Sequence, residues 1–197
     1  MVLIFGILLN SGCYKFEEDQ TVPTYLKIDT VLLKTYYPEE GTNSHNITDV
    51  WIYVNDNIEG IYELPAQFPV LAEGVKKLDI RPGIKINGIS STRAPYPFYE
   101  PISYVDFEFF PDSVMYLKNP QAEYYKNLVF AWLEDFENPG NSLDESPASD
   151  PVIERTEPAN NPEAFLSENS KFSGVVHLTT EKPIYSAATY NSFPMPK

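Results

Sequence analysis

The sequence contains a single cysteine, Cys13, among 197 residues. One cysteine cannot form an internal disulfide, and it excludes structural zinc centres built from several cysteines. Histidine is almost as scarce, and the two that occur, His45 and His177, do not stand at a metal-ligand spacing. The sequence therefore predicts neither a metal site nor a cofactor.

Basic residues are few compared with acidic ones. The chain has 14 Lys and Arg against 28 Asp and Glu, which gives a formal net charge of −14. A field of this sign repels phosphate backbones, so we expect no nucleic-acid partner.

The motifs of common enzyme classes are missing as well. No Gly-rich phosphate loop occurs, and no G-x-S-x-G context surrounds Ser90 or another serine that would act with His177. The acidic stretch at 144–150 lacks the spacing of an EF-hand calcium loop. These absences predict a protein that is not an enzyme.

Two acid pairs remain as candidates for glycosidase carboxylates. They are Glu134 with Asp135, and Asp106 with Glu108, which share one face of a predicted strand. The interpretation that we favour for both pairs is a solvated strand face.

No apolar run is long enough to cross a bilayer as a helix, which needs about 20 residues. The longest stands at the start, Val2 to Leu9, and has the length of a secretory signal core, about 7–15 residues. Small residues Ser11 and Gly12 then precede Cys13, and the stretch resembles a bacterial lipoprotein lipobox. The alternative is a buried apolar strand with a core cysteine.

The lipobox resemblance implies that the Cys13 sulfur receives a diacylglyceryl group and that signal peptide 1–12 is removed. Residues 14–23 are polar and end at Pro23, so residues 13–23 are expected to form a tether. Acyl chains such as palmitate would then hold the protein to a membrane. No Lys or Arg precedes the apolar run, which a missing upstream stretch of the gene would explain.

An acidic segment, KFEED at 15–19, follows the cysteine. It resembles the export signal of Bacteroidetes-type lipoproteins, which implies an outer-membrane protein facing the cell exterior. The alternative is an ordinary solvated tether.

Prolines and aromatic residues are abundant: 18 Pro, 14 Tyr and 12 Phe. Together with short alternating segments, they predict an all-β fold, an antiparallel β-sandwich over residues 24–117. The expected strands are 25–32, 50–54, 58–64, 76–80, 102–109 and 114–117. The prolines of 64–71 are expected to interrupt sheet pairing, and Pro82-Gly83 and Asn87-Gly88 are expected to form turns.

The segment from VNDNIEG to KKLDIRPGI resembles a PEGA domain, with a longer insert at LPAQFPVL. The positions that carry the resemblance are Val54, Asn55, Gly60, Pro65, Gly74 and Gly83. The resemblance implies an Ig-like fold and indicates almost nothing about chemistry.

Composition changes in the second half, 118–197. Residues 120–136 fit either a helix or a strand. We favour a strand at 128–133, because LEDFE, followed by NPG and a long polar loop, resembles the start of a concanavalin-like jelly roll. An acidic loop at 137–170 and strands at 174–179 and 186–190 are expected to follow. A jelly roll needs eight strands, so this part is expected to be incomplete or to pack onto the first sandwich.

Five aromatic residues fall in predicted loops and are candidates for ligand contact: Tyr36, Tyr37, Tyr96, Phe98 and Tyr99. Loop aromatics of this kind can stack on sugar rings. The alternative, which we favour, is that they plug the ends of the sandwich.

The sequence thus predicts a membrane-anchored surface lipoprotein that acts as an adhesion, scaffold or accessory module. Its expected partners are the membrane, through the lipid anchor, and a surface glycan or other envelope proteins. The alternative is a glycan-binding module of a polysaccharide-utilisation system.

Overall fold

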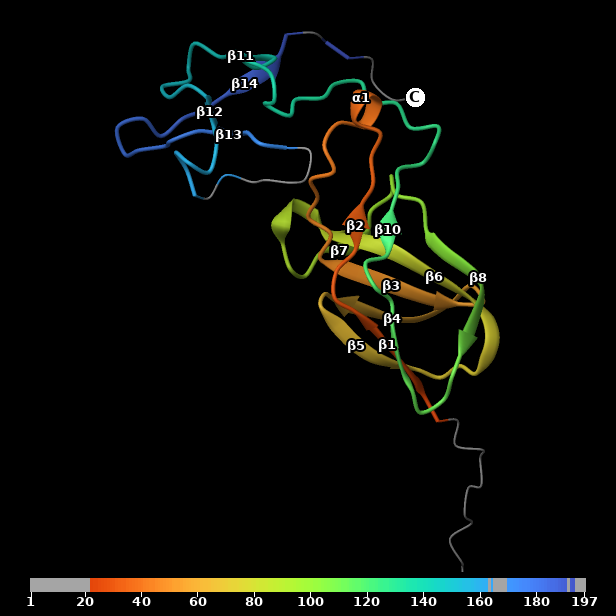
Figure 1. Ribbon diagram of the computed structural model, residues 1–197. Coiled ribbons are helices and arrows are strands. Elements are labelled where there is room, and N and C mark those ends of the chain that lie inside the picture. Colours follow the sequence, from red (N-terminus) through yellow and green to blue (C-terminus); the bar gives the residue numbers. More distant parts are fainter. Residues whose placement is uncertain (1–21, 163, 165–169, 191, 194–197) are drawn as a thin grey trace, which may run out of the picture.

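The computed structural model describes residues 22–162, 164, 170–190 and 192–193 (Figure 1). Cys13, the predicted signal and most of the predicted tether lie outside this part of the chain. The predicted all-β class is confirmed, since the described helices are one turn of α-helix, α1 (Tyr37–Glu40), and a short 3-10 turn (Ile86–Gly88). Among the described residues, no helix has the length and apolarity to cross a membrane.

The larger of two main sheets has five strands. They are β3 (Asp49–Val54), β4 (Asn57–Glu63), β6 (Gly74–Lys85), β7 (Arg93–Pro95) and β8 (Ile102–Phe109). Strand β3 pairs with β4 on one side and with β6 on the other, all antiparallel. The far side of β6 has two successive partners: β8 along Gly74–Ile80, then β7 along Gly83–Lys85.

The second sheet is smaller and contains parallel pairing. Its strands are β1 (Thr24–Ile28), β5 (Ala66–Val70) and β9 (Val114–Tyr116), with β1 in the middle. Strand β1 is antiparallel to β5 and parallel to β9. A short parallel pair, β2 (Leu32–Leu33) with β10 (Gln121–Ala122), continues beside it.

The core lies between these sheets, so the fold is β-sandwich-like. Burial alternates along β1, as the period of a strand requires, whereas β3 is buried at nearly every position. The fully buried side chains include Leu26, Ile28, Val50, Ile52, Leu78, Ile80 and Phe109. Burial of each such side chain contributes about 1.5–3 kcal/mol to folding.

Several predicted strands are present with small shifts. The hairpin of β3 and β4 and the bounds of β8 are confirmed, whereas the predicted strand 25–32 is divided into β1 and β2. The turn at Asn87-Gly88 is also confirmed, with positive φ at both residues.

The expectation that prolines would prevent pairing at 64–71 is wrong, because Ala66–Val70 forms β5. Pro69 stands opposite Tyr25. The Tyr25 N–H donates to the Ser113 carbonyl on the other side of β1, so Tyr25 and Pro69 are not a hydrogen-bonded pair. The missing N–H of the proline therefore faces the free edge of the sheet, where proline is tolerated.

The expected turn at Pro82-Gly83 is also wrong, because β6 continues through both residues. The Pro82 carbonyl accepts a hydrogen bond from the Tyr96 N–H. The N–H that proline lacks would point to the same side of β6, where β8 has ended and β7 begins, so no ladder hydrogen bond is lost. Gly83 is required by packing: an added Cβ would lie 2.0 Å from Cζ3 of Trp51.

The strand predicted at 128–133 is absent, and so is the alternative helix. The described strands beyond β10 are four short ones: β11 (Leu143–Glu145), β12 (Glu154–Thr156), β13 (Ser173–Val175) and β14 (Ala187–Thr189). They form two antiparallel pairs, β11 with β14 and β12 with β13. Strands β13 and β14 fall within or beside the predicted strands 174–179 and 186–190. Figure 1 shows these pairs as a separate lobe beside α1.

Candidate functional site

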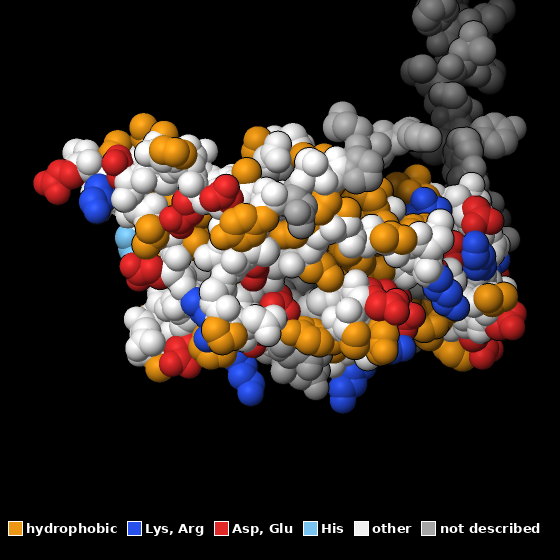
Figure 2. All heavy atoms as spheres, turned by 90° about the horizontal axis from the view of Figure 1, so that it is seen from above, with side chains coloured by type: hydrophobic (Ala, Val, Ile, Leu, Met, Phe, Trp, Pro, Cys, Tyr) orange, Lys and Arg blue, Asp and Glu red, His pale blue; other side chains and the backbone are white. Residues whose placement is uncertain are grey.

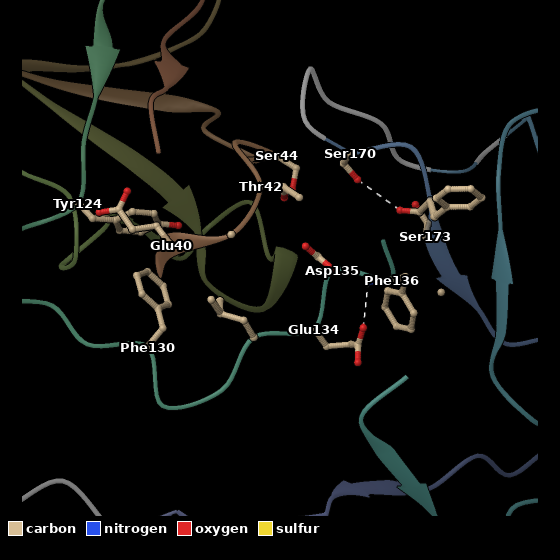
Figure 3. Close-up of a pocket in the computed structure, with 14 residues that line it drawn as sticks. Glu40, Thr42, Ser44, Tyr124, Phe130, Glu134, Asp135, Phe136, Ser170 and Ser173 are labelled. Carbon is tan, nitrogen blue, oxygen red and sulfur yellow. Dashed lines mark hydrogen bonds between the residues drawn. The ribbon is translucent and has the colours of Figure 1, made fainter. Parts of the chain in front are cut away.

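Two concave regions occur at the end of the sandwich from which the C-terminal lobe extends. The larger is a cavity of about 340 Å³ between α1, the irregular segment after β10 and strand β13 (Figure 3). The smaller is a groove of about 120 Å³ beside β6. Figure 2, which looks onto this end, shows hydrophobic and acidic side chains across its middle and Lys and Arg mainly towards the rim.

Acidic and aromatic side chains line the cavity together. Its lining includes Glu40, Tyr124, Phe130, Glu134, Asp135 and Phe172. Figure 3 shows Glu134 and Asp135 on the segment that crosses between the sandwich and the lobe. Such a lining has the residue types of a sugar-cleaving site, so the hydrogen bonds of the carboxylates decide what it can do.

These carboxylates already serve the fold. Glu134 accepts from the Phe136 and Ser142 amides at 2.9 and 2.6 Å. Asp135 accepts from the Tyr37 hydroxyl at 2.8 Å and from the Glu137 amide at 3.0 Å. A carboxylate that accepts backbone N–H groups stabilises a turn. We therefore assign Glu134 and Asp135 to holding an irregular segment in place; they do not form the solvated strand face that the sequence indicated.

The groove lies where the pairing partner of β6 changes from β8 to β7. The loop between β7 and β8 crosses this place, and the residues that line the groove are Arg81, Pro82, Pro95, Tyr96, Pro97, Tyr99, Pro101 and Tyr125. The loop is fixed to the segment after β10, since the Glu100 amide donates to the Glu123 carbonyl and the Tyr125 amide to the Phe98 carbonyl. The walls are therefore held by backbone hydrogen bonds.

Aromatic rings connect the groove with the core and the cavity. Tyr96 lies 5.3 Å from Phe98 and 4.6 Å from Tyr99, and Tyr99 lies 5.1 Å from Tyr124, measured between ring centroids. Tyr99 is only 8% exposed. Burial, followed by the neighbouring Tyr124, raises the pKa of Tyr99, so the phenol stays protonated at physiological pH.

Arg81 supplies the only cationic side chain among the residues that line the groove. Its guanidinium carbon lies 4.3 Å from the centroid of the Tyr53 ring, an arrangement typical of cation–π contact. Its Nε is buried and has no hydrogen-bond partner within the described protein. Buried polar groups are nearly always paired, so Nε is an exception. Because Nε is buried, Arg81 contributes its positive charge to the groove and not this N–H.

The structure brings together part of the predicted aromatic set. Tyr96 and Tyr99 line the groove, and Phe98 packs against Tyr96 with its side chain 45% exposed. Tyr36 and Tyr37 lie at α1, away from the groove lining. The interpretation as a core plug holds for Tyr99, which belongs to the core cluster.

Apart from the prolines, the groove residues that are not on the sequence-predicted list are Arg81 and Tyr125. Arg81 is a strand residue between apolar neighbours, and Tyr125 stands in the segment that fits either a helix or a strand. Only the alternation of β6 carries a signal, because it places Arg81 on the face opposite Leu78 and Ile80.

The remaining candidates do not assemble into catalytic sites. Ser90 lies in the turn before β7, whereas His177 follows β13 in the C-terminal lobe. Asp106 and Glu108 are exposed on β8, as a solvated strand face requires. Over the residues that the structure describes, no three His, Cys, Asp or Glu side chains gather as metal ligands.

No protein-family model, curated protein or solved structure matches this chain. The PEGA-like and lipoprotein assignments therefore stay predictions.

Proposed function

We propose that this protein is a lipid-anchored lipoprotein of the outer membrane that displays its β-sandwich-like domain outside the cell as an adhesion, scaffold or accessory module. The observation that carries the proposal is the place of the only cysteine. Cys13 follows an apolar stretch and two small residues and is followed directly by an acidic run. This order is typical of a lipobox with a surface-export signal.

The fold supports the proposal through the spacing between Cys13 and the sandwich. Strand β1 begins at Thr24, 11 positions after Cys13 (24 − 13). An extended chain of this length spans roughly 35 Å. Cleavage before Cys13 would therefore leave the sandwich intact and joined to its anchor by a short tether.

The test is the Cys13→Ala variant, expressed in a bacterium that carries lipoprotein-processing enzymes. Wild-type protein is expected to incorporate labelled palmitate and to fractionate with the membrane, whereas Cys13→Ala loses both properties. Ser11→Ala, which keeps a small residue before the cysteine, is the matched control and should be processed normally. A wild-type protein that keeps an unmodified Cys13 and an uncleaved start would contradict the proposal.

A second candidate function is glycan binding, and the groove beside β6 favours it. Tyr96 and Tyr125 offer aromatic surface for the apolar face of a sugar ring, and Arg81 offers a positive charge for its oxygens. Prolines form much of the remaining wall, which limits the entropy lost when a ligand binds.

This candidate is tested on a glycan array with the variants Arg81→Gln and Tyr125→Ala. Each should weaken binding by about tenfold, because a stacked ring or a charged hydrogen bond contributes on the order of 1–1.5 kcal/mol. Tyr36→Ala removes an aromatic side chain that is 61% exposed and outside the groove lining, so it should leave binding unchanged. Tyr99 is unsuited to the test, because its removal would open a hole in the core. Binding that survives in both groove variants would exclude the groove as the site.

A further inference from the structure

Exposed apolar side chains gather at the end of the sandwich where the described chain begins. We call this set the entry cluster: Val22, Leu71, Val75, Phe110 and Val114. Their exposed fractions run from 49% for Val22 and Phe110 to 67% for Leu71. Soluble proteins scatter such residues singly, and several together mark a contact surface.

Hydrogen bonds hold the members of the cluster at one end of the fold. The Asp112 amide donates to the Pro23 carbonyl at 3.0 Å, and the Thr24 hydroxyl donates to the Ala72 carbonyl at 3.1 Å. Gly74, at the start of β6, stands opposite Phe109, at the end of β8. The β5–β6 and β8–β9 turns therefore flank the start of β1, as Figure 1 shows at the lower end of the sandwich.

The cluster does not belong to the core. Phe109 is 1% exposed and fills the interior, whereas its neighbour Phe110 is turned outward and is 49% exposed. Val114 precedes Met115, which packs against the core. Val75 lies in the exposed start of β6. Burying these side chains against another surface would therefore stabilise a contact without changing the fold.

We propose that the entry cluster rests on the lipid bilayer, so that the sandwich docks on the membrane and does not swing freely from its anchor. The inference rests on the proposed acylation of Cys13. The chain between Cys13 and Val22 has nine steps (22 − 13) and spans at most about 30 Å. This segment joins the sandwich at the entry end. The entry end is therefore the part of the described surface that is held nearest to the membrane.

The charges beside the cluster indicate which kind of lipid surface fits. Glu73 and Asp112, in the two flanking turns, are both exposed. Carboxylates at this position are repelled by anionic headgroups. The contact is therefore apolar insertion among zwitterionic headgroups, without a polybasic attraction.

The experiment uses the full acylated chain in phosphatidylcholine vesicles that contain nitroxide-labelled acyl chains. The variant Leu71→Trp places a fluorophore in the cluster. Ile89→Trp is the matched control, because Ile89 is 53% exposed beyond the opposite end of β6. After subtraction of the wild-type signal, the emission of Leu71→Trp should be quenched at least about twofold more than that of Ile89→Trp, since interfacial side chains lie within about 5–10 Å of the acyl boundary.

The triple variant Leu71→Ser, Val75→Ser and Phe110→Ser supplies a second measurement. Hydrogen exchange at 71–75 and 110–114 should slow on vesicles for the wild type and stay unchanged for this variant. If the protein floats with the vesicles but the two introduced indoles are quenched equally, the proposed anchoring stands and the docking proposal is overturned. A dimer that covers the indole of Leu71→Trp would likewise overturn it and assign the cluster to a second copy. Protein that does not float at all would overturn the proposed anchoring itself.

Discussion

Arg93 neutralises two carboxylates on the outer face of the five-stranded sheet. Its Nη1 lies 2.8 Å from Oδ1 of Asp49, and its Nη2 lies 2.6 Å from Oε2 of Glu63. Asp49 has no exposed surface, and its other oxygen accepts from the Thr48 hydroxyl at 2.6 Å. The pKa of the Glu63 carboxyl is lowered by hydrogen bonds from Lys85 and Arg93. The guanidinium thus allows a fully buried charge on a strand.

Arg93→Ala should lower the free energy of unfolding by about 3 kcal/mol, because removing one partner leaves a buried charge uncompensated. Urea denaturation at neutral pH measures this change. Lys34→Ala is the control, since the Lys34–Glu123 pair is exposed on both sides and should be worth less than about 1 kcal/mol. Equal losses in the two variants would contradict a special role for the Asp49–Arg93 pair.

The candidate groove illustrates what single residues reveal before a structure is known. Tyr96 and Tyr99 stand out in the sequence because prolines flank them in a loop. Arg81 does not, because its role depends on β6 changing partner beside it. The alternation of β6 gives the face of Arg81 but not its neighbours, because distant strands supply them. Most of the groove therefore could not be predicted from the sequence.

At the scale of elements, β6 is the strand that organises the larger sheet. It spans 12 residues and pairs with three other strands. Gly83 leaves room for the Trp51 ring, because a Cβ at this position would overlap it. This close approach buries Trp51, which is 6% exposed although it lies on the outer face.

Gly83→Ala should destabilise the protein by about 2 kcal/mol, because the new methyl group overlaps the indole and forces it to move. Thermal or urea unfolding checks the loss. In a Trp51→Leu background, Gly83→Ala should lower the free energy of unfolding by at least about 1 kcal/mol less, because mutations of residues in contact are not additive. A purely additive double mutant would mean that the indole is not the obstacle.

Elements defined by local pattern were predictable, and those defined by context were not. The β3–β4 hairpin and β8 follow from alternation and from turn residues such as Asn55 and Asp56, which have positive φ. Strand β5 tolerates Pro69 because it lies at the edge of its sheet, and β6 tolerates Pro82 because its partner changes there. Both conditions exist only in the assembled sheets. The segment 128–133 has strand-like residues but no partner strand in the structure, and it stays irregular.

At the scale of the whole molecule, the C-terminal lobe is held by polar contacts. Glu137 accepts from the Lys171 and Phe172 amides at 2.6 and 3.0 Å, and the Arg155 guanidinium lies over the Phe172 ring. No residue of the lobe belongs to the apolar core cluster of the described chain. Side-chain hydrogen bonds to the backbone thus take the place of apolar burial there.

Tyr37→Phe should loosen the lobe without unfolding the sandwich, because the Tyr37 hydroxyl links α1 to Asp135. Amide exchange at 134–145 should accelerate severalfold, while the free energy of unfolding changes by less than about 1.5 kcal/mol. The hydrogen bond, together with burial, raises the pKa of Tyr37 above 10.0. The link is therefore present below pH 10 and is lost as the pH rises through the raised pKa. Tyr36→Phe serves as control, and unchanged exchange in Tyr37→Phe would mean that other contacts hold the lobe.

The parallel pairing of β1 has a consequence for biogenesis. Tyr25 aligns with Val114, 89 positions later (114 − 25), and with Pro69 on the other side. Contacts between such distant segments form late and slowly. During synthesis the first strand thus has no neighbour until β5 emerges, and its parallel partner β9 follows only after all strands of the larger sheet. The two sheets can therefore close over their shared core only near the end of synthesis of the sandwich.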